Sequence, residues 1–251
     1  MDFRTADGSP AQVLVTGASR GIGKALVDAL LAEAGVGRVF AVARNWPEAP
    51  QRDGRIVHIN CDLTRSEDVQ RLRQRVVAAV PRLDLVINCA GFLHERAGQQ
   101  PEKSLSQLSL AGLQRSFEIN AFAPILLAQA LLPLLRGTHR CVFASLSARV
   151  GSIGDNRLGG WYAYRASKSA QNMLLRTFAI EWQRLNRSGI CLLLHPGTTD
   201  TELSRPFQAR VPAGKLFTVD FVAERLLEII ARSAPEDTGR FYAWDGQPIP
   251  W

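Results

Sequence analysis

The stretch Ala11–Ala25, AQVLVTGASRGIGKA, decides the fold. Its first residues, Ala11–Gly17, form a short apolar run that ends in glycine, which is typical of a buried strand. A glycine-rich turn follows, and the apolar residues of Gly23–Gly35 then recur at helical spacing. A glycine turn between a strand and a helix leaves backbone N–H groups at the start of the helix, where an anion can bind. The stretch therefore predicts a strand–turn–helix unit with a phosphate site.

The alternation of strand and helix continues along the chain. The predicted strands are apolar throughout, which is typical of a parallel sheet covered on both faces. We therefore expect one α/β domain over residues 1–251, a Rossmann fold with a doubly wound parallel sheet of about seven strands and helices on both faces, preceded by a tail over residues 1–10. The predicted strands are Ala11–Gly17, Arg38–Arg44, Arg55–Asp62, Leu83–Gly91, Arg140–Ser147, Gly189–Gly197 and Gly239–Trp244. The predicted helices are Gly23–Gly35, Ser66–Val80, Leu113–Leu135, one that carries Tyr164 and runs to about Arg187, and Val219–Ser233.

Composition and charge are those of a globular protein. Apolar residues make up 46% of the 251 residues and charged residues 21%, so the chain can bury a full core. The net charge of +7 comes from arginines that are scattered rather than gathered in basic runs, which argues against a nucleic-acid partner. The apolar stretch Ala121–Gly137 is interrupted by prolines and predicts a buried helix rather than a membrane span.

The cysteines indicate a reducing environment. Cys61, Cys89, Cys141 and Cys191 are far apart and lie in or beside apolar runs. Their spacing fits neither a metal site nor a Cys-x-x-Cys pair, so we interpret them as small buried residues. The first residues, MDFRTADGSPA, contain no apolar signal region. We expect a soluble, cytoplasmic protein that binds no membrane and holds no metal.

The glycine turn and two arginines indicate a dinucleotide. Gly17, Gly21 and Gly23 permit a tight turn and a close approach of the backbone to a pyrophosphate, although any strand–helix connection can use a glycine. The second strand ends at Arg44, where an acidic residue would hold an adenosine 2′-hydroxyl and an arginine suits a 2′-phosphate. Arg20 in the turn adds a second guanidinium. Each arginine alone could be an ordinary surface residue, but together they favour NADP over NAD.

Polar and small residues follow the later strands. Asp62 could cap the next helix or accept a hydrogen bond from an adenine amino group. Asn88–Gly91, NCAG, would let the backbone pass beside a flat ligand. Tyr164 and Lys168 lie four residues apart and therefore share one face of their predicted helix. Tyr162 has no lysine four residues further on and is expected to be a bystander.

These motifs, in this order and at these spacings, resemble the classical type of the short-chain dehydrogenase/reductase family over nearly the whole chain. Within it, Ala148–Asn172 and His195–Phe217 resemble the C-factor group, which lies near the small carbonyl reductases. The resemblance implies an oxidoreductase that reduces a ketone or aldehyde, in a homodimer or homotetramer. The two arginines make NADPH its expected cofactor, and we expect a small, apolar carbonyl substrate. The cofactor-binding residues that the resemblance implies are Gly17, Ser19, Arg20, Gly21, Ile22, Gly23, Arg44, Asp62, Leu63, Asn88, Ala90, Gly91, Tyr164, Lys168, Pro196, Gly197, Thr199 and Thr201.

The resemblance also implies a catalytic set of Asn120, Ser147, Tyr164 and Lys168. A free phenol has a pKa near 10, and the Lys168 ammonium with an oxidised nicotinamide would lower the pKa of Tyr164 toward neutral pH. Lys168 would also bind the nicotinamide ribose. Asn120 would bend its helix and hold a water that links Lys168 to solvent. The alternative for Asn120 is a buried amide satisfied by its neighbours.

The serine departs from the family pattern. The usual strand ending is Ser-Ser-x-x-Gly, with the second serine catalytic, and alignment on Gly151 places Ser147 at the first serine and Ala148 at the second. Either Ser147 takes the role through a bulge between Ser145 and Gly151, or Tyr164 alone holds the carbonyl oxygen. We expect Ser147 to take the role.

The segment Thr198–Thr218 has little periodicity and several turn-forming residues, so it predicts a loop that covers the substrate. Apolar side chains in and near it would form the pocket, although each could instead be ordinary packing. These side chains are Leu93, Trp161, Phe207, Val211, Leu216 and Phe217.

A second class of function stays open, namely a C-factor-like signalling or regulatory protein that binds the dinucleotide, with turnover secondary. A sensor has no need of a proton donor, so the presence of Asn120, Tyr164 and Lys168 favours an enzyme. The missing second serine leaves the alternative open.

Overall fold

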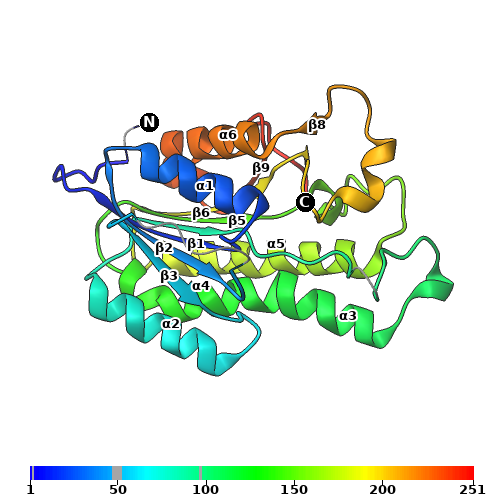
Figure 1. The fold of residues 1–251 in the computed structure, drawn as a ribbon, viewed down its shortest axis with the longest axis horizontal. Helices are drawn as coiled ribbons and strands as arrows, with labels where there is room; N and C mark the ends of the chain where they lie inside the picture. Colours follow the sequence, from blue (N-terminus) through cyan, green and yellow to red (C-terminus); the bar gives the residue numbers. More distant parts are fainter. Residues whose placement is uncertain (2, 47–52, 96–97) are drawn as a thin grey trace.

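The protein is built on one large parallel sheet, seen in a computed structural model that describes residues 1, 3–46, 53–95 and 98–251. The sheet has seven strands in the order β3-β2-β1-β4-β5-β6-β9 (Figure 1). All neighbouring strands in it run parallel, which confirms the predicted doubly wound sheet. The strands are β1 (Ala11–Thr16), β2 (Val36–Ala43), β3 (Ile56–Asn60), β4 (Leu85–Asn88), β5 (Cys141–Leu146), β6 (Gly189–His195) and β9 (Arg240–Ala243).

The strand order reverses between β1 and β4. The chain begins in the middle of the sheet at β1, moves outward through β2 and β3, and then returns to the other side of β1 with β4. In such sheets, ligands bind beyond the carboxyl ends of the strands at the point of reversal. The residues that follow β1 and β4 therefore mark the place where a site is expected.

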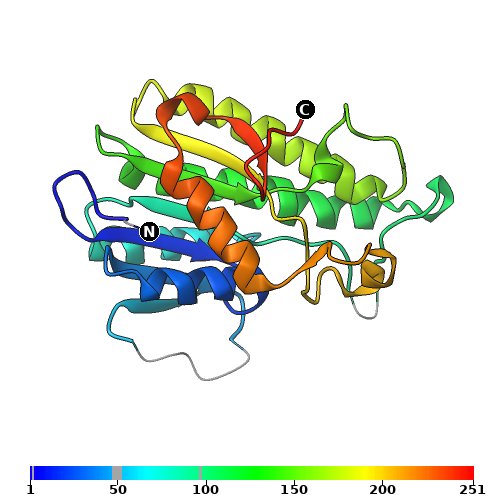
Figure 2. The same cartoon turned by 90° about the horizontal axis from the view of Figure 1, so that it is seen from above.

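Helices cover both faces of the sheet (Figures 1 and 2). Helices α1 (Gly21–Ala32) and α6 (Val219–Arg232) lie on one face, and α2 (Ser66–Ala79), α4 (Ala123–Leu135) and α5 (Tyr162–Trp182) lie on the other. Each face has its own apolar core cluster, because the strand residues alternate between the two sides. The buried residues of α6 recur at helical spacing and explain why this segment is an amphipathic helix; they are Val222, Ala223, Leu226, Leu227 and Ile230.

The helix predicted over Leu113–Leu135 is interrupted. The structure has α3 (Leu110–Phe117), a π-helical turn (Glu118–Phe122) and then α4. By length and composition Leu110–Leu135 could cross a membrane, but half of its most apolar window is buried inside the protein. Leu127 and Leu131 of α4 are fully buried in the core, so this segment is a core helix of the fold.

The predicted loop and the predicted N-terminal tail both contain residues with a defined place in the fold. Within Thr198–Thr218, β7 (Thr198–Thr199) pairs with β8 (Leu216–Phe217), and a 3-10 helix spans Arg205–Arg210. The predicted loop therefore contains short regular elements, and its covering of the substrate stays a prediction. In Figures 1 and 2 this orange segment lies at the same end of the molecule as the start of α5. At the N-terminus, Phe3 joins the apolar core beside α1.

Replacing Gly23 by alanine should destabilise the fold. A Cβ at this position would lie 2.2 Å from the carbonyl oxygen of Gly17. A backbone oxygen cannot swing aside, so we expect a loss of about 2 kcal/mol. This corresponds to a fall of about 4–8 °C in melting temperature. Gly54→Ala is the matched control because no heavy atom lies within 4 Å of the added carbon. Equal melting temperatures for the two variants would contradict this packing.

Candidate active site

The glycine turn after β1 has a backbone that a ligand can approach closely. Gly17 and Gly21 have φ angles of 65° and 55°, in the left-handed region that favours glycine. A Cβ on Gly21 would lie 3.3 Å from the Thr201 side chain, so the turn borders a second predicted cofactor residue. Helix α1 begins at this turn without a side-chain hydrogen bond at its N-cap, Arg20. Its first N–H groups can therefore receive an anion.

The residues predicted to bind the adenosine end of the cofactor are two arginines and one aspartate. The side chains of Arg20 and Arg44 are exposed, and within the described ranges neither forms a hydrogen bond or ion pair. Asp62 Oδ1 accepts hydrogen bonds from the Thr64 N–H at 3.0 Å and the Thr64 hydroxyl at 2.7 Å. Burial raises the pKa of Asp62, but these hydrogen bonds and the nearby Arg44 charge outweigh burial and lower it. Asp62 is thus an ionised acceptor, and its side chain does not cap α2.

Asn88 links three neighbouring strands at the carboxyl edge of the sheet. Its Oδ1 accepts a hydrogen bond from the Thr16 hydroxyl at 2.7 Å, and its Nδ2 donates to Ser145 Oγ at 2.9 Å. The side chain is fully buried and joins β1, β4 and β5. Of the residues that follow, Gly91 lies close to the catalytic candidates, since a Cβ there would be 4.0 Å from Lys168 Nζ.

Lys168 and Tyr164 lie side by side at the start of α5. Lys168 Nζ lies 5.9 Å from the centre of the Tyr164 ring and donates hydrogen bonds to Leu146 O at 2.9 Å and Gln171 Oε1 at 2.8 Å. Burial lowers the pKa of Lys168 to about 7. Burial also raises the pKa of the Tyr164 phenol above its usual value. Without the cofactor, the chain therefore does not lower the pKa of Tyr164 as expected.

Asn120 sits in the π-helical turn and joins two sides of the site. Its Oδ1 accepts the Phe92 N–H at 2.8 Å, and its Nδ2 donates to Phe92 O at 2.8 Å and to Ser167 Oγ at 3.0 Å. The amide is thus satisfied by its neighbours, which was the alternative expectation. It also fixes the segment after β4 against the residue that precedes Lys168.

The position expected for Ser147 was wrong. Its hydroxyl donates to Asn172 Oδ1 at 2.6 Å, about two turns of α5 beyond Tyr164. The register of β5 with β6 is regular through Leu146, and the Ser147 N–H continues it with a bond to Leu194 O at 2.8 Å. No bulge is present, so alternation turns Ser147 toward the core under α5 and Ala148 to the opposite side.

Trp161 connects the start of α5 to the segment expected to cover the substrate. Its ring lies 6.3 Å from Tyr164 and 4.9 Å from Phe207, centre to centre. Within the described parts of the chain it is the one residue other than glycine with a positive φ, 52°. Sequence reasoning missed this strain and also Glu102, whose carboxylate accepts the Ala163 N–H at 3.3 Å. The neighbouring Gly159–Gly160 pair was the signal for an unusual backbone here.

The other predicted pocket residues are more dispersed. Phe217 packs against Trp244 and also against Phe221 of α6. Leu93 is buried, whereas Leu216 is exposed. The structure therefore brings Trp161 to Tyr164 and Phe207 to Trp161, whereas the contacts of Phe217 place it in a separate aromatic cluster.

The remaining residues at this edge fit a bound dinucleotide. Thr199 Oγ1 is buried and, among the residues that the structure describes, has no hydrogen-bond partner. Gly197 has a φ of 75°, and a Cβ there would lie 2.7 Å from the Phe217 ring, so this backbone is fixed beside the orphaned hydroxyl. An amide-bearing ring could satisfy Thr199. The glycine turn and the open N-terminus of α1 suit a pyrophosphate.

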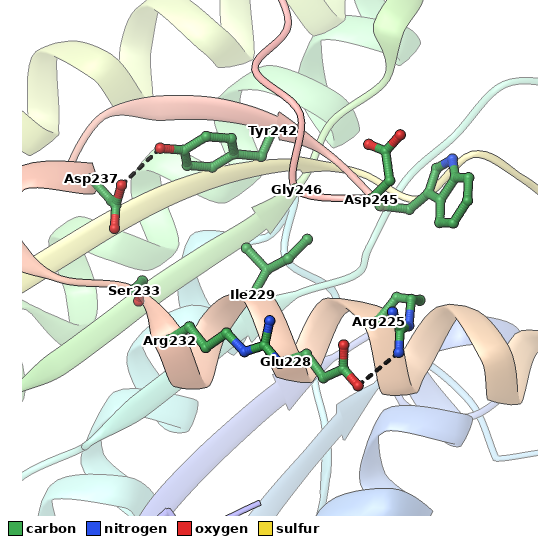
Figure 3. A pocket seen from close by; sticks show the side chains of 10 residues that line it. Arg225, Glu228, Ile229, Arg232, Ser233, Asp237, Tyr242, Asp245 and Gly246 are labelled. Atoms are coloured by element: carbon green, nitrogen blue, oxygen red, sulfur yellow. Dashed lines mark hydrogen bonds and ion pairs between the residues drawn. The ribbon is translucent and has the colours of Figure 1, made fainter.

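A hollow elsewhere in the molecule is separate from this site. It has a volume of about 270 Å³ and lies between α6 and the end of β9 (Figure 3). Two interactions join residues of its lining, from Arg225 to Glu228 of α6 at 2.8 Å and from the Tyr242 hydroxyl to Asp237 at 2.7 Å. Its lining includes none of the predicted catalytic or cofactor residues.

Comparison with known proteins assigns the family. A sequence profile described as short chain dehydrogenase matches residues 11–211. The chain is 31% identical over 240 residues to 1-hydroxy-2-glutathionyl-2-methyl-3-butene dehydrogenase of Rhodococcus sp. (strain AD45), covering 95% of this chain and 99% of that protein. It is 38% identical over 150 residues to C-signal of Myxococcus xanthus, covering 59% of this chain and 84% of that protein.

Solved structures agree with this assignment. The NADPH-bound carbonyl reductase from chicken fatty liver superposes with a TM-score of 0.84 at 27% identity, over 97% of this chain and 100% of that one. The carbonyl reductase Sniffer of D. melanogaster also gives a TM-score of 0.84, at 25% identity, over 96% of this chain and 100% of that one. The chain therefore belongs to the short-chain dehydrogenase/reductase family, with relatives among the C-signal and carbonyl reductase proteins.

Proposed function

We propose that this oxidoreductase reduces a ketone or aldehyde with NADPH and that Tyr164 donates the proton. The observation that carries the proposal is the pairing of Tyr164 with Lys168 at the carboxyl edge of the sheet, beside Gly91 and the residues anchored by Asn120. The NADPH-bound state of the chicken carbonyl reductase supports the choice of cofactor.

The cofactor residues divide into groups along the edge of the sheet. The glycine turn and the start of α1 would hold the pyrophosphate, and Arg20 and Arg44 would bind a 2′-phosphate. Asp62 would accept a hydrogen bond from the adenine amino group. Thr199 and Thr201 would hold the carboxamide of the nicotinamide. When bound, the nicotinamide supplies the hydride for the carbonyl carbon.

The protein's own part is to orient the carbonyl group and to supply the proton. Burial raises the pKa of Tyr164, so the phenol stays protonated and can donate a hydrogen bond to the carbonyl oxygen. As negative charge develops on that oxygen, the phenol transfers its proton and the alcohol forms. The adjacent Lys168 ammonium stabilises the resulting phenolate. Trp161 and Phe207 would exclude water on the substrate side.

The alternative is a signalling protein in which dinucleotide binding outweighs turnover. Identity to C-signal of Myxococcus xanthus favours it. The two functions differ in one observable, because only the enzyme requires an acidic proton at Tyr164. NADPH oxidation against a panel of carbonyl compounds separates them.

Arg44→Asp should weaken NADPH binding more than NADH binding. Loss of a charge-assisted contact to the 2′-phosphate costs about 1.5–3 kcal/mol, or roughly 10- to 100-fold in Kd. Fluorescence titration with each cofactor measures the change. Arg73→Asp on the exposed face of α2 alters the net charge equally and is the control. Equal affinity of the unmodified protein for both cofactors would refute the assignment to NADP.

Tyr164→Phe should abolish carbonyl reduction, by a factor of about 10² or more, because the proton donor is lost. NADPH affinity should stay nearly unchanged. Tyr162→Phe removes an exposed hydroxyl two residues away and should leave turnover intact. If Tyr164→Phe and Tyr162→Phe reduced substrate at the same rate, Tyr164 could not be the donor.

Ala148→Ser should raise turnover, because it restores a hydroxyl on the side of the strand opposite to Ser147. Removing one donor to a developing oxyanion typically lowers kcat by about 10²- to 10³-fold, so one added donor should raise kcat by up to about 10²-fold. Ser147→Ala should instead lower the melting temperature, because the buried Asn172 Oδ1 loses its hydrogen-bond donor. It should change kcat by less than about threefold. A large loss of kcat in Ser147→Ala with an unchanged melting temperature would reverse this assignment.

A further inference from the structure

The hydrogen bonds of Lys168 determine what its side chain can still bind. Nζ donates to Leu146 O and to Gln171 Oε1, and the side chain is buried. An ammonium carries three N–H bonds, whereas a neutral amine carries two. With two donors committed to the protein, a third donor for a ligand exists only while Lys168 is protonated.

Gln171 is itself fixed by a row of buried hydrogen bonds, here named the polar ladder and formed by Thr16, Asn88, Ser145 and Gln171. Gln171 Nε2 donates to Ser145 Oγ at 2.7 Å and to Leu146 O at 3.2 Å. Ser145 Oγ also accepts from Asn88, which accepts from Thr16. All four side chains are fully buried. Because the amide nitrogen of Gln171 is committed to the ladder, its oxygen faces Lys168.

Few other groups act on the charge of Lys168. The titratable groups packed around it are Tyr164, one turn earlier on α5, and Cys89 at the end of β4. No Asp or Glu among the described residues contributes to its pKa, and burial lowers that pKa to about 7. Near neutral pH the two protonation states of Lys168 are therefore close in free energy, so an acceptor that stabilises the protonated form changes its population.

We propose that Gln171 is a positioning residue: its side-chain oxygen keeps Lys168 protonated and leaves the third N–H for the ligand side of the site. The inference rests on the proposed function, in which Lys168 acts with Tyr164. It adds to that function a residue that touches neither substrate nor cofactor.

The direct test is the titration of Lys168 in the cofactor-free protein. The chain has four lysines, Lys24, Lys103, Lys168 and Lys215, so NMR of isotope-labelled lysine side chains resolves them, with Lys168→Met for assignment. Gln171→Met keeps the length of the side chain without the acceptor, and the pKa of Lys168 should fall by about one pH unit. Gln171→Glu keeps the oxygen and adds a negative charge, so the pKa should rise by a similar amount.

The pH dependence of turnover should follow the same directions. Activity falls as pH rises through the pKa of Lys168, because the third donor is then lost. The high-pH limb of kcat/KM should therefore move to lower pH in Gln171→Met and to higher pH in Gln171→Glu. Thr16→Val cuts the far end of the polar ladder and is the control, expected to lower the melting temperature while leaving the Lys168 titration in place.

Opposite shifts in the two Gln171 variants support the proposal. Identical Lys168 titrations in all proteins, with only melting temperatures lowered, would overturn it and leave Gln171 a structural residue. If Gln171→Met does not fold, Gln171→Glu decides, and an unchanged or lowered pKa there overturns the proposal. The NMR result needs no substrate, so failure of the reductase activity itself would be seen separately, as absence of NADPH oxidation by the unmodified protein.

Discussion

The close approach of the carboxyl ends of β1 and β4 is the constraint on which the site depends. A Cβ on Gly17 would lie 3.0 Å from both Ala90 N and Cys89 C, so no other residue fits without displacing backbone. The Thr16–Asn88 hydrogen bond holds the two strand ends at this separation. Because the strand order reverses here, the glycine turn and Gly91 come to the same edge of the sheet.

At this edge of the sheet, a titratable ammonium group is also buried away from solvent. Lys168 is buried under the residues that follow β4 and β5, and burial alone favours its neutral form. Lys168 donates hydrogen bonds to two fixed neutral acceptors, Leu146 O and Gln171 Oε1, and in our proposal these bonds oppose the effect of burial without adding a negative charge. In this proposal Gln171, which the polar ladder holds in place, is the residue that acts on the protonation of Lys168.

Much of the architecture could be predicted from the sequence, because continuously apolar strands and amphipathic helices have clear patterns. Features set by tertiary contacts could not. The π-helical turn depends on bonds between Asn120 and the Phe92 backbone, which lie far apart in sequence. The two-residue strands β7 and β8 are too short to show a period.

The errors at the site have the same origin. Ser147 was expected beside Tyr164, but a regular strand commits its hydroxyl to Asn172, 25 residues later. Gln171 was overlooked because a glutamine near an apolar helix face gives no sign of which buried partner it meets. The glycines and the Tyr164–Lys168 pair were recognisable because their local spacing already contains the required geometry.

The central claim is that the chain transfers hydride from NADPH to a carbonyl carbon. The most direct measurement uses NADPH deuterated at C4 of the nicotinamide with a panel of apolar ketones and aldehydes, and mass spectrometry of the products. We expect an alcohol that carries the deuterium on its carbinol carbon. NADPH that binds and is never oxidised by any member of the panel, or an alcohol formed without the label from either C4 position, would contradict it.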